Sequence, residues 1–440
     1  MLKTFNIGGV HPEENKLSAN APIEILPYPK TMIIPVAQSL GAPSIPVVEK
    51  GAKVKTGQLI AKGEGFIASN IHSPVTGTVT KIDDALDSSG YKRKAIFIDV
   101  DAEEWEEGID TSADLKKEIT LSSEEIVNKI KEKGIVGLGG ATFPSHVKMM
   151  VPQGKKAEVL IINAVECEPY LTSDHRLMLE KADEIMVGVS IIMKALNVTR
   201  AIIGIENNKP DAIAHLSKIA ANFKGIEVVA LKVKYPQGAE KQLIKAAINR
   251  EVPSGKLPIE VGAVVQNVGT AFAVYEAVQK NKPLIERVVT ITGKGLKKPS
   301  NLMVRIGTPV TLLIEHAGGM PEKTGKVING GPMMGKALNS VDVPVVKGTS
   351  GIVVVQDEET KREEVYNCIR CGKCVSVCPM GLEPYLLAVV SEQEKLEEAE
   401  KDRIMDCMEC GSCHYTCPSG RPLLDYLRVG KNKIMRSRKK

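Results

Sequence analysis

Residues 368–379 read CIRCGKCVSVCP, and residues 407–418 read CMECGSCHYTCP. Both stretches have the spacing C-x2-C-x2-C-x3-C-P, which is typical of proteins with two [4Fe–4S] clusters. Cysteines three residues apart on a tight loop can bind three irons of one cluster, and the fourth cysteine reaches the other cluster. This geometry predicts two ligand sets, which are Cys368, Cys371, Cys374 and Cys417 for the first cluster, and Cys407, Cys410, Cys413 and Cys378 for the second.

The alternatives for these cysteines are zinc sites and disulfides. Zinc sites usually need only paired C-x2-C knuckles, so the third cysteine and the proline of each run would have no role. The N-terminus, MLKTFNIGGVHP, has no apolar signal core, so we expect a cytoplasmic chain, in which thiols stay reduced. Cys167, the ninth cysteine, stands alone in an apolar segment and is expected to be a buried thiol.

The overall composition narrows the classes of function. The chain has 440 residues, of which 43% are hydrophobic, so it can bury several cores. A net charge of +5 is too small to indicate a nucleic-acid partner. We find no run of about 18 apolar residues that would span a membrane. The end of the chain is basic, because seven Lys and Arg residues and no acidic residue follow Asp425. We expect this end to be a frayed, solvated tail or a contact with acidic lipid or an acidic partner.

The patterns along the chain predict a multidomain α/β protein. The segments 48–65 and 72–79 resemble the two halves of a lipoyl- or biotinyl-type barrel-sandwich, but the place of the modified lysine reads GEGFIASN. We therefore expect a structural copy without a swinging arm. The predicted domains are a barrel-sandwich-like β domain (1–110), an α/β flavin-nucleotide domain (115–280), a β-grasp domain of the soluble-ligand-binding kind (285–350), a helical two-cluster ferredoxin-like domain (355–430) and a basic tail (431–440).

Several elements are expected from apolar periodicity and from Gly and Pro punctuation. The expected strands are 31–36, 58–61, 77–82, 159–162, 201–205, 228–233, 287–292 and 310–315. The expected helices are 176–196, 211–223 and 391–404. Strands that alternate with helices between 120 and 275 indicate a parallel sheet with helices on its faces.

A glycine-rich segment, GIVGLGGATFPSHVKM, covers residues 134–149. Glycines at Gly134, Gly137, Gly139 and Gly140 allow backbone N–H groups to approach a phosphate or a flat ring closely, and Lys148 can add a positive charge. The spacing is neither G-x-G-x-x-G after a strand nor a P-loop ending in GK[ST]. A plain turn is the alternative interpretation.

Polar residues follow three of the expected strands. Asn163, Glu166 and Glu168 follow VLIIN, Gly238 and Glu240 lie in YPQGAEKQ, and Gln266, Asn267 and Thr270 lie in VVQNVGT. The carboxyl ends of parallel strands form the ligand crevice of such a sheet. Asn can hydrogen-bond the edge of a ring, and carboxylates can hold ribose hydroxyls.

These segments recur, in this order and in related form, in the flavin- and NADH-binding subunit of respiratory complex I, which this region resembles. The resemblance implies FMN contacts from Gly137, Gly139, Gly140, Lys148, Asn163, Glu166, Tyr235, Gly238, Gln266, Asn267 and Thr270. It implies NADH contacts from Phe143, Glu168 and Glu240. The sequence departs from that pattern at Leu138, Thr142, Val165 and Ala239, where a basic residue, Gly, Asp and Glu are usual.

Over residues 3–425 the whole order of features resembles the C subunit of the Rnf ion-translocating electron-transport complex. The resemblance implies a peripheral subunit at the cytoplasmic face of the cell membrane, bound to other subunits of an ion-translocating NAD:ferredoxin oxidoreductase. It implies two [4Fe–4S] clusters, FMN, and NAD(H) as substrate, with a ferredoxin-type redox partner reached through the complex and membrane contact that is indirect or made by the basic tail. The alternatives are an electron relay without flavin or NADH catalysis, and a non-redox scaffold.

Overall fold

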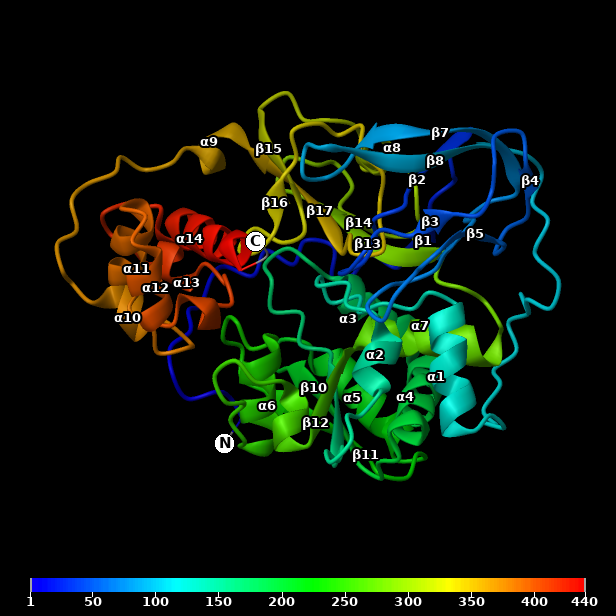
Figure 1. Ribbon diagram of the computed structural model, residues 1–440, viewed down its shortest axis with the longest axis horizontal. Helices are drawn as coiled ribbons and strands as arrows, with labels where there is room; N and C mark the ends of the chain where they lie inside the picture. Colours follow the sequence, from blue (N-terminus) through cyan, green and yellow to red (C-terminus); the bar gives the residue numbers. More distant parts are fainter. Residues whose placement is uncertain (1, 439–440) are drawn as a thin grey trace.

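The structure is a computed structural model that describes residues 2–438. Its elements form four units (Figure 1). In that view an α/β unit lies at the bottom, two β-rich units lie above it, and a helical unit that contains both cysteine runs lies at the left. No helix among the described residues is both long and apolar enough to cross a bilayer.

The first unit consists of two small sheets, with strand orders β2-β8-β7-β4 and β3-β5-β6. Alternate residues of the strands point into one aliphatic core, to which Ile34, Ile60 and Ile98 contribute. The segment 63–70, in which a carrier domain would present its modified lysine, joins two of these strands as a loop. Strands are confirmed at the three places expected in this unit. The strands of the unit are β2 (Thr31–Pro35), β3 (Ile45–Pro46), β4 (Lys53–Val54), β5 (Leu59–Lys62), β6 (Ile71–His72), β7 (Gly77–Leu86) and β8 (Lys92–Val100), of which β2, β5 and β7 are the expected ones.

The second unit is a parallel four-stranded sheet with helices on both faces, as expected from the alternation of strands and helices. Its strands are β9 (Val159–Asn163), β10 (Ala201–Glu206), β11 (Ile226–Leu231) and β12 (Ala263–Asn267). Its helices are α1 (Ser123–Glu132), α2 (Ser145–Met149), α3 (Ser173–Glu180), α4 (Ala182–Leu196), α5 (Pro210–Ala220), α6 (Glu240–Ile248) and α7 (Val268–Gln279), with a 3-10 turn at Pro258–Val261. The strand order is β11-β10-β9-β12, so the direction of winding reverses between β9 and β12. That switch point is where ligands bind in such sheets.

Two expected elements of this unit differ in detail. The single helix expected over 176–196 is two helices, because Lys181 has φ −131° and separates α3 from α4. The strand expected over 228–233 lies two residues earlier, at Ile226–Leu231, and the helix expected over 211–223 ends at Ala220.

The third unit is a six-stranded mixed sheet with the order β1-β14-β13-β17-β15-β16. Its strands are β1 (Ile23–Ile25), β13 (Glu286–Thr292), β14 (Ser300–Arg305), β15 (Thr324–Asn329), β16 (Lys336–Ala337) and β17 (Gly351–Gln356). The strand expected over 310–315 was wrong, because these residues form helix α8 (Val310–His316). Val310, Leu313, Ile314 and Ala317 are buried and follow the spacing of one helix face.

The fourth unit is helical and contains both cysteine runs. Its helices are α10 (Lys373–Ser376), α11 (Pro384–Glu392), α12 (Leu396–Lys401), α13 (Ser412–Tyr415) and α14 (Leu423–Ser437), with a 3-10 turn at Ile404–Asp406. The short helix α9 (Asp357–Thr360) follows β17 and packs on β15 and β17 of the third unit. The continuous helix expected over 391–404 was wrong, since Glu394 has φ +58° and the chain turns between α11 and α12. The frayed tail was also wrong as far as Ser437, because α14 continues to that residue and buries Ile434. Residues 439–440 of the expected tail lie outside the described part.

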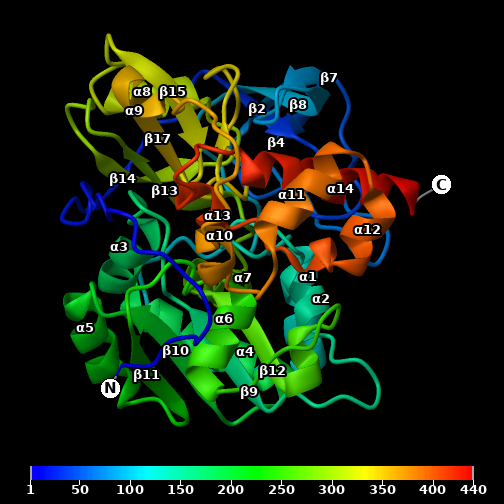
Figure 2. The same ribbon diagram turned by 90° about the vertical axis from the view of Figure 1, so that its left-hand side faces the viewer.

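The N-terminal segment, residues 2–22, ties three of the units together (Figure 2). Lys3 and Val10 form backbone bridges to Leu231 and Tyr235 of the α/β unit. The N–H of Gly9 donates to the carbonyl of Val377 in the helical unit at 2.9 Å. The segment continues into β1 of the third unit, which pairs with β14. The cysteine runs are therefore held against the sheet by the other end of the chain.

Candidate functional site

The second cysteine run lines a largely apolar pocket of about 350 Å³. Cys407, Cys410 and Cys413 line it together with Cys378, which comes from the first run. Leu424 and Leu427 of α14 also line it. Three of the four thiols are only 7–8% exposed. Burial raises the pKa of Cys407 to about 11, and it raises the pKa of Cys413 further, with the neighbouring three thiols adding to the rise.

The first cysteine run has the same backbone form but a different environment. Arg370 and Gly372 have positive φ, as do Glu409 and Gly411 at the equivalent positions of the second run. Cys368 and Cys371 are exposed, while Cys374 and Cys417 are partly buried. Burial raises the pKa of Cys374, and the nearby Cys368 and Cys417 add to the rise. The structure thus places the fourth cysteine of each run beside the other run.

The eight thiols do not converge as ligands of a single ion would. Within residues 2–438 no three His, Cys, Asp or Glu side chains come together closely enough to hold one metal ion. A cubane differs, because each of its four irons takes one thiolate. Backbone N–H groups lie near two sulfurs, since Leu382 N–H and Glu409 N–H approach the Sγ atoms of Cys378 and Cys407 at 3.4 Å. The donor set therefore fits a pair of [4Fe–4S] clusters.

The glycine-rich segment forms an exposed loop at the switch point of the sheet. Gly137 N–H donates to the carbonyl of Phe143 at 2.9 Å, which closes the loop, and Leu138 N–H donates to Thr270 Oγ1 at 2.9 Å. Gly139 and Gly140 are exposed, and their N–H groups have no acceptor among the described residues. Gly140 has φ +110° and open space around its Cα. Free N–H groups on such a turn form a site for an anion or a hydrogen-bond acceptor.

The ends of β9 and β12 supply amide side chains beside this loop. Asn163 Nδ2 donates to Gly238 O at 2.7 Å, and Asn267 Oδ1 accepts the N–H of Gly269 at 2.8 Å and so caps α7. Gln266 is 2% exposed, and its Nε2 has no partner among the described residues. A buried donor without a partner is costly, so a ligand that accepts a hydrogen bond here would be stabilised. The loop and this amide fit the flavin implied by the sequence.

Lys148 and Glu240, both expected to contact a ligand, form an ion pair with each other. Lys148 Nζ donates to Glu240 Oε1 at 2.8 Å and to Val265 O at 3.2 Å. The expected flavin contact and the expected NADH contact are therefore an ion pair, and both side chains are about one-third exposed.

Glu166 has a structural task in the fold. Its carboxylate accepts the N–H groups of Asp174 at 2.7 Å and His175 at 3.1 Å, at the start of α3. These are the amide groups that a helix leaves unpaired, so Glu166 stabilises the helix terminus. Burial and the nearby Glu166 charge raise the pKa of Asp174 to about 7. Asp174 in turn accepts from Asn267 Nδ2 at 2.7 Å.

Glu168 and Tyr235 connect the sheet to the helical unit and to the third unit. The carboxylate of Glu168 accepts the N–H groups of Met333 and Met334 at 3.1 and 2.8 Å. Burial raises the pKa of Glu168 to about 7. The hydroxyl of Tyr235 donates to the carbonyl of Cys410 at 2.8 Å. Tyr235 therefore contacts the second cysteine run, while Glu168 holds the loop of Met333 and Met334 in the third unit.

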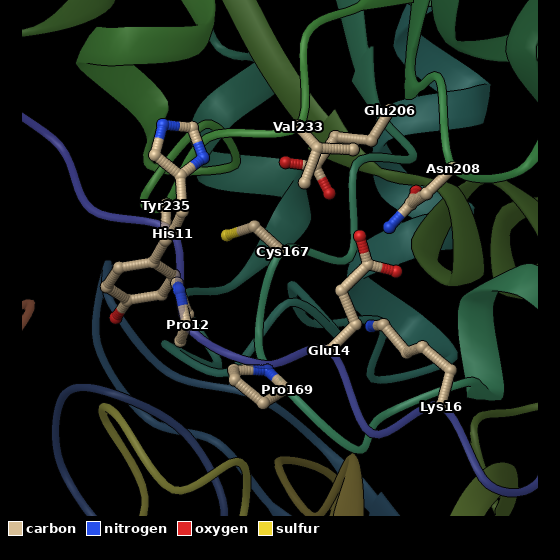
Figure 3. Close-up of a pocket in the computed structure, with 10 residues that line it drawn as sticks. All are labelled: His11, Pro12, Glu14, Lys16, Cys167, Pro169, Glu206, Asn208, Val233 and Tyr235. Carbon is tan, nitrogen blue, oxygen red and sulfur yellow. The ribbon is translucent and has the colours of Figure 1, made fainter.

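A second cavity, of about 280 Å³, lies under the N-terminal segment (Figure 3). Glu14 and Glu206 direct their carboxylates into it, and Cys167 lines its wall. Burial raises the pKa of Cys167, so this thiol is uncharged, as a structural cysteine would be. Lys16 at its edge donates to the carbonyls of Glu166, Glu168 and Leu171 at 2.7–2.9 Å, which fixes the loop after β9.

Sequence reasoning missed Lys16 and also Arg287 and Lys347, two buried cations behind the glycine loop. For Arg287 a signal was present, because a charged residue near the start of the apolar strand ERVVTIT is costly unless it has partners. For Lys16 and Lys347 no sequence signal exists, since both lie in loops and their partners are distant carbonyl groups.

Four family models match the chain. They are the Nuo51 FMN-binding domain over residues 130–276, the RnfC barrel sandwich hybrid domain over 3–103, the SLBB domain over 288–337 and a 4Fe-4S dicluster domain over 360–418. The first two span the α/β unit and the first β unit. The third covers much of the mixed sheet, and the fourth covers both cysteine runs.

Curated relatives match over most of the chain. The C subunit of the proton-translocating ferredoxin:NAD(+) oxidoreductase complex of Clostridium ljungdahlii is 50% identical over 90% of this chain and 86% of its own length. The C subunit of the Na(+)-translocating ferredoxin:NAD(+) oxidoreductase complex of Acetobacterium woodii is 43% identical over 98% of both chains. The C subunit of the ion-translocating oxidoreductase complex of Rhodobacter capsulatus is 42% identical over 88% of this chain and 75% of its own.

A solved structure shares the fold. An NAD+-reducing [NiFe]-hydrogenase in the H2-reduced state has a TM-score of 0.50 and 17% identity, and covers 70% of this chain and 61% of its own. At this identity the likeness concerns the fold alone.

Proposed function

The chain belongs to the RnfC family, the C subunits of ion-translocating ferredoxin:NAD(+) oxidoreductase complexes, and on this premise we propose that it exchanges electrons with NAD(H) through FMN and two [4Fe–4S] clusters. The observation that carries the proposal is the position of the second cysteine run. Tyr235, in the segment that follows β11 of the α/β unit, donates to Cys410 O at 2.8 Å, so the buried run contacts the unit that would receive the nucleotide.

The proposed cluster ligands are the two sets expected from the motif, in which each run lends its fourth cysteine to the other. The support is that Cys378 lines one cavity with Cys407, Cys410 and Cys413, while Cys417 lies near Cys368 and Cys374. When bound, FMN accepts a hydride and releases single electrons, which iron–sulfur clusters carry. The protein holds the thiolates at fixed separations and excludes water from the second set.

For the flavin, the proposed contacts are the eleven residues implied by the complex I resemblance. The free N–H groups of Gly139 and Gly140 and the unpartnered Nε2 of Gln266 support them. For the nucleotide, Phe143 and Glu240 lie at or near the loop. Glu168 would join them only if its carboxylate exchanged the amides of Met333 and Met334 for the nucleotide.

The exposed first run is the proposed exit for electrons toward other subunits of a membrane complex, with a ferredoxin-type partner reached through that complex. Cys368 and Cys371 are exposed, and Ile369 between them is 67% exposed. We further infer that the chain lies at the cytoplasmic face of the membrane. Membrane contact is more readily indirect than through α14, because Lys431, Lys433 and Arg438 pair with acidic residues of the same unit.

The folds of the two β-rich units are also proposals. The first unit is proposed as a barrel-sandwich and the third as a β-grasp, on the support of the matching family models and of the helix α8 packed on a mixed sheet. An electron relay without its own NADH chemistry is the competing function.

The test is an anaerobic spectrum of the full chain loaded with iron, sulfide and FMN. NADH should bleach the flavin absorbance and then the cluster absorbance. Bound FMN that NADH leaves unbleached would favour the relay, and a colourless chain without labile sulfide would reject both functions. Gly140→Val should weaken FMN binding, whereas Gly154→Val should not, although both glycines have positive φ and open space around them.

A further inference from the structure

The glycine loop is supported from behind by the third unit. Arg287, on β13, is 5% exposed, and its Nη2 donates to the carbonyl of Leu138 at 3.3 Å, while its Nη1 donates to the carbonyl of Lys347. Lys347, which lies in the loop before β17, is 1% exposed. Its Nζ donates to Gly134 O and Asn70 O, both at 2.7 Å, and to Ser69 Oγ at 3.2 Å. Two buried cations thus meet the carbonyl side of the loop.

The loop before β17 also packs closely against the glycine loop. A Cβ on Gly348 would lie 2.7 Å from Thr142 Cγ2 and 3.7 Å from Gly140 O. A side chain at this position would push the third unit away from the glycine loop. The glycine loop is therefore fixed by residues outside the α/β unit that contains it.

The cations have no direct anionic partner. Among the described residues, every hydrogen bond of Arg287 and Lys347 goes to an uncharged oxygen. Burial lowers the pKa of Arg287 to about 10 and that of Lys347 to about 7, and the nearest opposing charge on Arg287 is the more distant Asp174. Buried positive charge of this kind is costly unless negative charge lies nearby. An anionic group bound at the loop would supply it.

The geometry of the peptide bond between Leu138 and Gly139 determines the direction in which the loop N–H groups point. In a trans peptide the C=O and the N–H of the same unit point in opposite directions. Because Leu138 O is directed at Arg287, the N–H of Gly139 points away from the third unit. A cation at the carbonyl end also polarises the peptide and strengthens the donor at its other end. The sequence has Leu138 where the complex I pattern has a basic residue, so the loop itself carries no charge there.

We propose that Arg287 and Lys347 are positioning residues, which hold the glycine loop with its N–H groups toward the ligand and supply from the third unit the positive charge that Leu138 lacks. This inference rests on the proposed flavin function. Its consequence is that the flavin site requires two units of the chain, so the mixed sheet is part of the cofactor site.

The test uses the full, cluster-loaded chain stripped of flavin and titrated with FMN, followed by quenching of flavin fluorescence. Arg287→Gln should weaken binding by about ten- to a hundredfold, the effect of losing a charge-assisted hydrogen bond. It should also lower the flavin midpoint potential, measured by spectroelectrochemistry, because positive charge favours the reduced form. Lys347→Gln should weaken FMN binding and lower the potential by a smaller amount, because Lys347 bonds Gly134 O, at the start of the loop, whereas Arg287 bonds Leu138 O.

Two controls separate positioning from folding. Arg305→Gln removes a largely buried arginine of the same sheet that bonds Pro74 O and Glu286 instead of the loop, and should leave FMN affinity unchanged. Arg287→Lys keeps the charge and should recover much of the affinity lost in Arg287→Gln. Equal affinity of the Gln and Lys variants, with iron content and melting temperature intact, would overturn the role of charge.

Riboflavin provides the last comparison, because it lacks the phosphate. A loss that is larger for FMN than for riboflavin places the phosphate at the loop, and an equal loss places the ring there; both support the proposal. If the wild-type chain binds FMN and Arg287→Gln binds it equally with the same potential, the proposal fails while the flavin function stands. If the wild-type chain binds no flavin, the proposed function itself fails.

Discussion

The two cysteine runs have one motif and one backbone form, but they sit in opposite environments. The first exposes Cys368 and Cys371 to solvent, whereas the second buries Cys410 and Cys413 beside Leu424 and Leu427. The second run also contacts the α/β unit and the third unit. Tyr235 bonds Cys410 O, and Gly411 lies against Met333 of the third unit. The repeat therefore gives two runs of the same spacing, and packing alone places them in different environments.

This difference assigns an inner and an outer site. Water and a partner protein can approach the first run, while two of the cysteines of the second run are buried. Solvent exposure and hydrogen bonds around sulfur are among the factors that set cluster potentials. The two sites should accordingly differ in potential although their ligands are identical.

Removing one thiol from each run should give the largest contrast. Cys413→Ala and Cys371→Ala should each lower the iron content from about eight to about four atoms per chain, because each variant loses one cluster. Only Cys413→Ala should also lower the melting temperature strongly, because the cluster bound there would fill the pocket between α13 and α14. Iron and sulfide assays with calorimetry measure both effects. Equal melting temperatures for the two variants would remove the distinction between inner and outer sites.

The equivalent glycines of the two runs sharpen the comparison. Gly372 and Gly411 have φ +71° and +79°, but a Cβ on Gly372 would meet nothing within 4 Å, while one on Gly411 would lie 3.1 Å from Met333 O. Gly372→Ala should cost about 1 kcal/mol of unfolding free energy from left-handed strain alone. Gly411→Ala should cost about 2 kcal/mol or more, because the Met333 loop must also move. Denaturant titration of the two cluster-loaded variants measures the difference, and a larger loss for Gly372→Ala would contradict it.

The smallest expected effect concerns the carboxylate that holds the Met333 loop near the inner site. The pKa of Glu168 is raised to about 7 from its usual 4.5, so between these values the unfolded chain ionises while the folded chain keeps the proton. Stability from this group is therefore present below pH 4.5 and is lost as the pH rises through 7. Relative to Glu168→Gln, the wild-type chain should lose about 1–2 kcal/mol from pH 5 to pH 8, less than the full shift because the side chain is not fully buried.

Melting temperatures of wild type and Glu168→Gln across this pH range test the prediction. Glu364→Gln, which alters an exposed carboxylate beside the outer run, is the control and should follow the wild type. A wild-type chain that gains stability relative to Glu168→Gln as the pH rises would show that the two amides of Met333 and Met334 outweigh burial.

The fold followed from the sequence where periodicity and spacing are local signals. The run VLIIN predicted β9 because a parallel strand is apolar on both faces, and the cysteine spacing predicted the exchange of Cys378 and Cys417 that the folded chain brings near the opposite runs. The helix α8 was missed because seven residues of mostly apolar sequence fit a strand or a helix equally well until the sheet shows which face is buried.

Some site residues could be located from the sequence pattern, and others could not. Asn163, Gln266 and Asn267 were placed by strand ends, and they do gather at the switch point. Glu166 was expected at a ligand but caps α3, because the helix that needs it starts only seven residues later in a turn that the sequence does not reveal. Arg287 and Lys347 escaped notice because their partners are carbonyl groups 149 and 213 residues away.

The sequence by itself determined the chemistry of this protein, because ligand type, ligand spacing and the glycine-rich loop are written in short stretches whose geometry is local. Only the tertiary structure decided which cysteine run is buried, which carboxylates accept hydrogen bonds from backbone amides, and which cations bond the carbonyl groups of the glycine loop. Burial and electrostatic fields depend on residues far apart in the chain that packing brings together, and no local pattern encodes them.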